Sequence, residues 1–133
     1  MNILLTVLDV LLFHDQPLMM VATDMSGRRY VGLSYGDCGE DGRGPIAFGE
    51  VDRATLAELE SGTLDARRMM TERYSGLILL AKGIGLAGDT LVGRSVPRLP
   101  PQALPLPGLF VPAAHEHAPA QFSSWLLAPA AVA

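Results

Sequence analysis

The first candidate for chemistry in this chain of 133 residues is the glycine-rich stretch 83–88, which reads Gly-Ile-Gly-Leu-Ala-Gly. This spacing matches the G-x-G-x-x-G pattern with which dinucleotide-binding domains bring a pyrophosphate close to a helix N-terminus. The context does not support that function, because Gly93 and Pro97 prevent a long helix from following and no acidic residue lies about 20 positions further on. We interpret 83–88 as a connection between strands, and we predict no cofactor.

Metal binding has two candidates. His115 and His117 would lie on one side of an extended segment, but zinc needs more ligands, so His14 or Cys38 would have to arrive by folding. The single cysteine excludes an internal disulfide and fits a reducing compartment. We interpret the histidines as part of a solvated segment and predict no zinc site.

The second metal candidate lies in the loop 36–45, where Asp37, Asp41 and Gly42 match the first, fifth and sixth places of a calcium-binding loop. The twelfth place, which would supply a bidentate acid, is Phe48. The loop holds four glycines and three acids, which is typical of an exposed connection. We therefore predict no calcium site, and we expect Asp37, Glu40 and Asp41 to be available to a partner.

No arrangement for covalent or acid–base catalysis stands out in the sequence. There is no G-x-S-x-G motif, and the glycine-rich acidic loop around Cys38 would raise the pKa of its thiol. Glu58 and Glu60 are two positions apart on an expected helix and so do not face each other. We predict no catalytic residue and a protein that is not an enzyme.

Composition limits the cellular role. The net charge is −4 with no basic block, which disfavours nucleic-acid binding because a phosphate-tracking surface needs clustered Lys and Arg. No stretch reaches the roughly 18 to 20 apolar residues that span a bilayer, and residues 1–20 lack the features of a signal peptide. We expect a soluble cytoplasmic protein without membrane contact.

Four apolar runs organise the N-terminal part of the chain. They are separated by turn signals at Asp15 to Pro17 and at Ser26-Gly27, and by the glycine-rich loop. Val31 and Leu33 alternate with Tyr30 and Gly32, as in a half-buried strand. The pattern predicts an antiparallel meander with strands at 3–13, 18–23, 29–35 and 46–51.

Two short helices are expected after the meander. Asp52 is a good N-cap for a helix over 53–60, which Gly62 would end. Thr63 is the expected cap of a second helix, which ends near Tyr74. Short strands are then expected at 77–81 and 90–92.

The composition changes at Pro97. Eight of the ten prolines lie from there onward, which excludes long helices and central strands. This segment also carries Phe110, Phe122 and Trp125, which disordered segments seldom do. We predict a single α+β domain over 1–96 and an extended Pro-rich segment over 97–133 that docks in part on the domain or on a partner.

Several motifs resemble a small family of uncharacterised bacterial domains. Residues 10–18 look like its aromatic, acidic, Pro-Leu opening, and 26–30 look like its Gly-x-x-Tyr turn. The stretch 51–65 is similar to its short helix, Ser-Gly step and second helix. The resemblance covers about residues 3–75 and implies no catalytic residue, since that family has no assigned activity.

Together these features predict an α+β fold, a mainly antiparallel sheet with two short helices on one face. The expected function is that of a non-enzymatic protein-interaction module, and one expected arrangement is a homo-oligomer formed through the Pro-rich segment. The predicted partner contacts are Phe110, Phe122, Trp125, Asp37, Glu40 and Asp41. One alternative is a small acidic inhibitor, phage-encoded or defence-linked, that blocks a partner's surface. Another is a ligand-binding or enzymatic domain whose site forms only in three dimensions.

Overall fold

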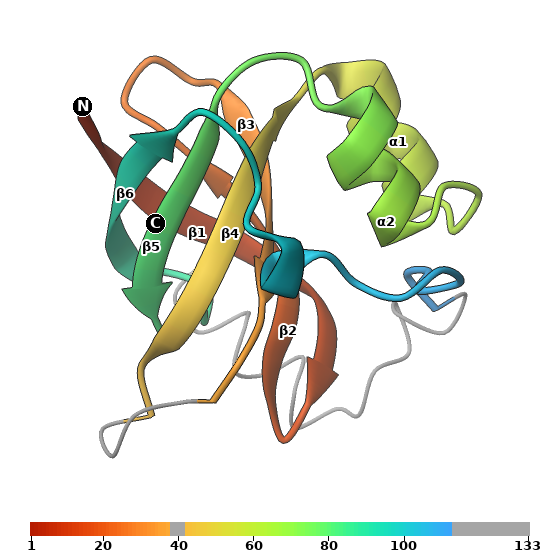
Figure 1. Ribbon diagram of the computed structural model, residues 1–133, viewed down its shortest axis with the longest axis horizontal. Helices are drawn as coiled ribbons and strands as arrows, with labels where there is room; N and C mark the ends of the chain where they lie inside the picture. Colours follow the sequence, from red (N-terminus) through yellow and green to blue (C-terminus); the bar gives the residue numbers. More distant parts are fainter. Residues whose placement is uncertain (38–41, 113–133) are drawn as a thin grey trace.

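The structure, a computed structural model, describes residues 1–37 and 42–112, and in these residues six strands form one antiparallel sheet. Each strand pairs with the next along the chain, and the last pairs with the first, so that the sheet closes into a barrel (Figure 1). The strands are β1 (Asn2–His14), β2 (Gln16–Thr23), β3 (Arg29–Ser34), β4 (Gly44–Val51), β5 (Ile78–Gly83) and β6 (Thr90–Val96).

The predicted fold, a mainly antiparallel sheet with two short helices on one face, is therefore wrong, because the sheet closes into a barrel through β1. This long strand pairs with β6 through residues 2–6 and with β2 through residues 6–14. Three irregularities interrupt its register with β2, and bulges of this kind bend a strand and increase its twist. β6 also continues to Val96, beyond the three residues expected, and so reaches both β1 and β5.

The four strands expected in the N-terminal part are confirmed in position and order. Asp15 is the one residue between β1 and β2, and it turns the chain with a φ of 62°, a conformation that Asp tolerates better than most residues. Gly27 has a φ of 90°, as expected for the glycine of the β2–β3 turn.

The barrel interior is filled by apolar side chains from all six strands. We call this cluster the inner core; its members are Leu5, Val7, Val10, Met20, Ala22, Tyr30, Ile46, Phe48, Leu79 and Leu91. Gly32 leaves room for it, because a Cβ there would lie 2.4 Å from the ring of Phe48 on the neighbouring strand. Small residues opposite large ones let a narrow barrel fill without voids.

A second apolar cluster lies outside the barrel, over β2, β3 and β4. The expected alternation in β3 is confirmed, since Tyr30 faces the inner core while Val31 and Leu33 face outward into this second layer. The expected half-burial of this strand is wrong, because the second layer covers its outer face. We call it the outer core; its buried members are Leu11, Met19, Val21, Val31, Leu33, Ala47, Val51, Leu59, Leu64, Ala66, Met69, Met70, Ala103 and Val111. Strands β2 to β4 are thus buried on both faces, which explains their nearly continuous apolar sequence.

Two helices cover the outer core (Figure 1). Helix α1 (Arg53–Glu60) has the predicted bounds, and the carboxylate of its predicted cap Asp52 accepts the N–H of Thr55 at 2.7 Å. Helix α2 (Ala66–Arg68) continues as a wider π-helical turn, η1 (Met69–Arg73), which ends at Tyr74 as expected.

The predicted cap of the second helix, Thr63, is wrong. Its hydroxyl instead donates to the carbonyl of Glu58 at 3.0 Å and so serves the C-terminal end of α1. The N-cap of α2 is Asp65, whose Oδ1 accepts the N–H of Arg68 at 2.7 Å. A carboxylate outcompetes a hydroxyl at this position because it adds a favourable interaction with the helix dipole.

Residues 97–112, which we call the strap, run from the end of β6 over the outer face of the barrel to α2 (Figure 1). The strap contains one turn of 3₁₀ helix, η2 (Pro101–Ala103), and otherwise follows an irregular extended path. Its side chains Ala103 and Val111 belong to the outer core, and Leu99, Leu104 and Leu109 pack against it. The part of the Pro-rich segment that is described therefore docks on its own chain.

Candidate functional site

The strap is fixed to the start of α2 by three hydrogen bonds. They join the N–H of Gly108 to Asp65 Oδ2 at 3.2 Å, the N–H of Ala66 to the carbonyl of Leu109 at 2.8 Å, and Arg67 Nη1 to the carbonyl of Pro105 at 3.0 Å. Asp65 therefore does two things, because one carboxylate oxygen caps α2 and the other holds the strap. The hydrogen bond from Arg68 N–H, with that from Gly108 N–H, lowers the pKa of Asp65 despite the cost of desolvation.

The apolar side chains of the strap point in two directions. Leu109 packs against the outer core, whereas its neighbour Phe110 is 43% exposed and Leu106 is 81% exposed. Gly108, with a φ of 91°, provides the turn between them. Two apolar side chains are thus presented to solvent by a backbone that is held in place on both sides of the turn.

The predicted contact residues are dispersed along the chain. Phe110 lies on the strap beside α2, and Asp37 is exposed in the connection from β3 to β4. Four further predicted contacts lie outside the described residues, namely Glu40, Asp41, Phe122 and Trp125. Phe110 and Asp37 therefore lie on separate segments of the chain, one on the strap and the other between β3 and β4.

The turn between β2 and β3 is organised by Asp24. Its Oδ1 accepts the N–H of Ser26 at 2.9 Å, the hydroxyl of Ser26 at 2.7 Å and the N–H of Arg28 at 3.0 Å. Its Oδ2 accepts the hydroxyl of Tyr30 at 2.8 Å. Partial desolvation raises the pKa of Asp24, but the hydrogen bonds outweigh it and lower the value to about 2. The carboxylate is therefore ionised and locks the turn.

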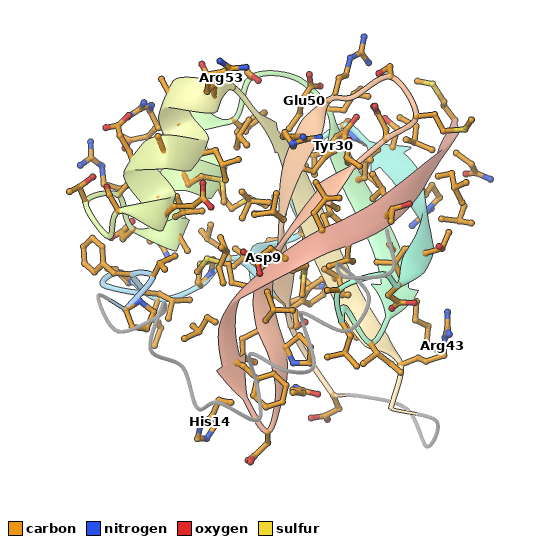
Figure 2. The ribbon with its side chains drawn as sticks, turned by 180° about the vertical axis from the view of Figure 1, so that it is seen from behind. Asp9, His14, Tyr30, Arg43, Glu50 and Arg53 are labelled. Carbon is orange, nitrogen blue, oxygen red and sulfur yellow. The ribbon has the colours of Figure 1, made fainter. Side chains whose placement is uncertain are left out.

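Tyr30 and Glu50 extend this network into the barrel. The ring of Tyr30 is fully buried in the inner core, and burial together with the hydrogen bond to Asp24 raises the pKa of its hydroxyl. Glu50, its partner on β4, accepts the N–H of Leu77 at 3.1 Å. In Figure 2 Tyr30 and Glu50 lie at the same end of the barrel. These bonds tie β2, β3, β4 and the start of β5 together, which is a structural role.

The glycine-rich stretch 83–88 forms the expected connection between strands β5 and β6. Its backbone turns at Gly85 and Gly88, which have φ values of 87° and 88°. The carboxylate Oδ2 of Asp89 accepts the N–H groups of Ile84 and Gly85 at 3.3 and 3.0 Å. Backbone donors that would face a phosphate in a nucleotide-binding loop are occupied here by a side chain of the protein itself.

The helical charges are also engaged with one another. The guanidinium of Arg73 pairs with the carboxylate of Glu58 and donates to the hydroxyl of Thr55, which joins η1 to α1. Arg68 pairs with Glu72 at 2.9 Å, one helical turn further on. In the described ranges, no buried side-chain nitrogen or oxygen lacks a hydrogen-bond partner.

The metal candidates lie largely beyond what the structure describes. His115, His117 and Cys38 are outside the described residues, as is Asp41 of the calcium-like loop. Over residues 1–37 and 42–112, no group of three or more His, Cys, Asp or Glu side chains is placed to hold a metal ion. Among these same residues, no helix is both long and apolar enough to cross a membrane.

Comparisons of this chain with protein-family models, with curated proteins and with solved structures give no match. The resemblance of residues 3–75 to a family of bacterial domains therefore stays a prediction. The fold and the surface geometry are the basis for a functional proposal.

Sequence reasoning missed three residues that shape the exposed surface, namely Leu106 of the strap and Met25 and Asp24 of the β2–β3 turn. For Leu106 the signal is its position between Pro105 and Pro107, just before the turn at Pro107 and Gly108. Asp24, two residues before Ser26 and three before Gly27, has the spacing of an Asx turn, and Met25 is then the residue at its tip.

Proposed function

We propose that this protein is a non-enzymatic protein-interaction module, an accessory or regulatory subunit that contacts its partner through the strap. The observation that carries the proposal is the exposure of Leu106 and Phe110 on a backbone fixed by three hydrogen bonds to the start of α2. The single cysteine suits a cytoplasmic setting, where disulfides are rare.

The energetic argument combines burial with rigidity. Fully covering a leucine or phenylalanine side chain contributes about 1.5–3 kcal/mol, so these two residues can anchor an interface. Their segment is already ordered by Asp65, Ala66 and Arg67, which lowers the entropy lost on binding. An interior filled by side chains from all six strands leaves the outer surface as the place for recognition.

The experiment is affinity capture from extracts of the source cell, followed by calorimetry with the purified captured protein. The strap variant is Leu106→Ser with Phe110→Ser. The matched control is Leu4→Ser with Val92→Ser, which removes two apolar side chains that face each other across β1 and β6 and are 45% and 58% exposed. Both double variants should keep the melting temperature, since all four side chains reach solvent.

The native protein and the control are expected to bind the captured protein with equal affinity, and the strap variant at least about tenfold more weakly. Equal affinity of the strap variant would show that the strap is not the contact. Failure of the native protein to bind any purified candidate would remove the interaction module as the function.

A further inference from the structure

The turn between β2 and β3 presents one apolar side chain on a rigid backbone. Met25 stands at its tip and is 90% exposed. The turn is closed by backbone bonds from Asp24 to Arg28 and from Gly27 to Asp24, both at 3.2 Å, in addition to the bonds that the Asp24 carboxylate accepts. A methionine is flexible and polarisable, and it adapts to irregular apolar surfaces. Here that adaptable side chain is carried by a backbone with little freedom of its own.

Four arginines surround this end of the barrel. Arg28 lies in the turn, and Arg29 begins β3. Arg29 pairs with Val51, the last residue of β4, and Arg53 begins α1 two residues later. Arg94 faces Asn2, at the start of β1. Figure 2 shows Arg53, Glu50 and Tyr30 together at this end, with His14 and Arg43 at the other.

The acids at this end of the barrel accept hydrogen bonds from backbone N–H groups. Asp24 holds the turn, Asp52 caps α1, and Glu50 accepts the N–H of Leu77 with its side chain only 20% exposed. The side chain of Arg28, which lies 3.9 Å from Glu50, is 56% exposed. Among the residues described, Arg53 and Arg94 have no ion-pair partner. Met25 and the side chains of Arg28, Arg29, Arg53 and Arg94 are all exposed there, whereas the acids beside them already accept hydrogen bonds from backbone N–H groups.

We infer that this end of the barrel, formed by Met25, Arg28, Arg29, Arg53 and Arg94, is a second interaction surface that binds an acidic protein segment carrying an apolar side chain. Guanidiniums bind carboxylates through two parallel hydrogen bonds, and all the basic residues of this surface are arginines. The apolar side chain of the partner would cover Met25, and because the turn is already ordered, little backbone entropy would be lost on binding. This surface is distinct from the strap, and the inference does not depend on the function proposed for the strap.

A protein segment fits better than a polyanion of uniform charge. The guanidinium of Arg28 lies 3.9 Å from the carboxylate of Glu50, and the carboxylate of Asp24 lies in the same turn, so these acids would repel a continuous row of phosphates. An acidic segment can place its own carboxylates between these acids and use an apolar residue at the centre. The net charge of −4 also disfavours general attraction to polyanions.

The test uses a fluorescent synthetic peptide of glutamate, aspartate and leucine, with binding followed by fluorescence anisotropy at low and at physiological salt. The comparison probes are the same peptide with serine for leucine, an oligothymidylate, and vesicles that contain phosphatidylglycerol. The variants of the whole chain are Met25→Ser and the pair Arg28→Ala with Arg29→Ala. The control Lys82→Ala removes an exposed charge from β5, near the other end of the barrel.

Saturable binding of the leucine-containing peptide is expected, about tenfold weaker for each turn variant and unchanged for Lys82→Ala. The serine-containing peptide should bind more weakly to the native protein and equally to Met25→Ser. No saturable binding, or equal weakening by Lys82→Ala, would overturn the inference. Binding of the oligothymidylate or the vesicles in preference to the peptide would show that the class of partner is wrong.

Discussion

Asp24 shows how a single carboxylate can replace several backbone hydrogen bonds in a turn. It accepts two backbone N–H groups and two hydroxyls, one of them from the buried Tyr30. In water each of these donors would be solvated, so the advantage lies in bringing them to one ionised acceptor with fixed geometry. The shape of the β2–β3 turn therefore depends on the charge state of one residue.

The free energy of unfolding should respond to pH through Asp24. Its pKa is lowered from 3.8 to about 2, so the folded state favours the carboxylate, and the contribution is full above pH 4 and lost as the pH falls toward 2. Asp24→Asn should therefore reduce the free energy of unfolding by about 1–2 kcal/mol at pH 7 and by much less near pH 2, after allowance for solvent screening. Urea unfolding of both proteins across this range measures the difference.

Asp15→Asn is the matched control, because Asp15 is an exposed carboxylate in another hairpin turn and asparagine tolerates its positive φ. It should leave the free energy of unfolding at pH 7 within about 0.5 kcal/mol of the native value. A pH-independent difference between Asp24→Asn and the native protein would show that the Asp24 carboxylate does not hold the turn by its charge.

At the scale of elements, the strap and α2 depend on each other. Helix α2 is too short to be stable alone, and its cap Asp65 also binds the strap. The strap in turn adds Ala103 and Val111 to the outer core that α1 and η1 share. Loss of Asp65 should consequently loosen an element to which it is not adjacent in sequence.

Asp65→Ala and Asp52→Ala make a matched pair that tests this coupling. Both residues cap a helix with a 2.7 Å hydrogen bond, but only Asp65 also accepts the N–H of Gly108. Each substitution should cost about 1 kcal/mol as a lost cap. Only Asp65→Ala should speed amide exchange at Gly108 and cleavage by chymotrypsin near Phe110. Equal protection of the strap in the two variants would contradict the coupling.

The sequence predicted the local elements well where one interaction decides the outcome. Asp52 is the only capping residue at the start of α1, and Gly27 is the only glycine in its turn. The second helix was placed on the wrong cap because Thr63 and Asp65 are both good N-caps, and the deciding bonds come from Glu58 and from Gly108 on the distant strap. The residues around Thr63 and Asp65 give no signal of a contact with a residue that is distant in the sequence.

At the scale of the whole molecule, closure of the barrel was missed for a related reason. Alternation and turn signals report on pairs of consecutive strands, whereas the pairing of β1 with β6 joins the first and last strands. The irregularities in the pairing of β1 with β2 have no composition signal of their own. The sequence could predict that the strap docks, because it carries apolar residues among its prolines. It could not predict which part of the protein the strap packs against.

The two cores share strands β2 to β4, so they should unfold together. Leu5→Ala opens a cavity in the inner core and Leu59→Ala one in the outer core, where both leucines are fully buried. Each should lower the free energy of unfolding by about 2–5 kcal/mol while leaving a single transition, seen alike by far-ultraviolet and near-ultraviolet circular dichroism.

The control for these cavity variants is Leu8→Ala, which alters an exposed leucine of β1 and should change the free energy by no more than about 0.5 kcal/mol. If Leu59→Ala produced a second transition at lower temperature, the helices and the strap would form a separate unit of stability. The outer core would then be an addition to the barrel and not a part of its cooperative structure.

The double pairing of β1 also has a consequence for synthesis. Of the six strands, β1 leaves the ribosome first, yet its partner for residues 2–6 is β6, the last to be made. The hairpins from β2 to β4 join neighbours in sequence and can form early, whereas joining Asn2 to Arg94 closes a loop of most of the described chain. During that interval the N-terminal part of β1 is an open strand edge, the kind of surface that nascent chains expose to chaperones and to one another.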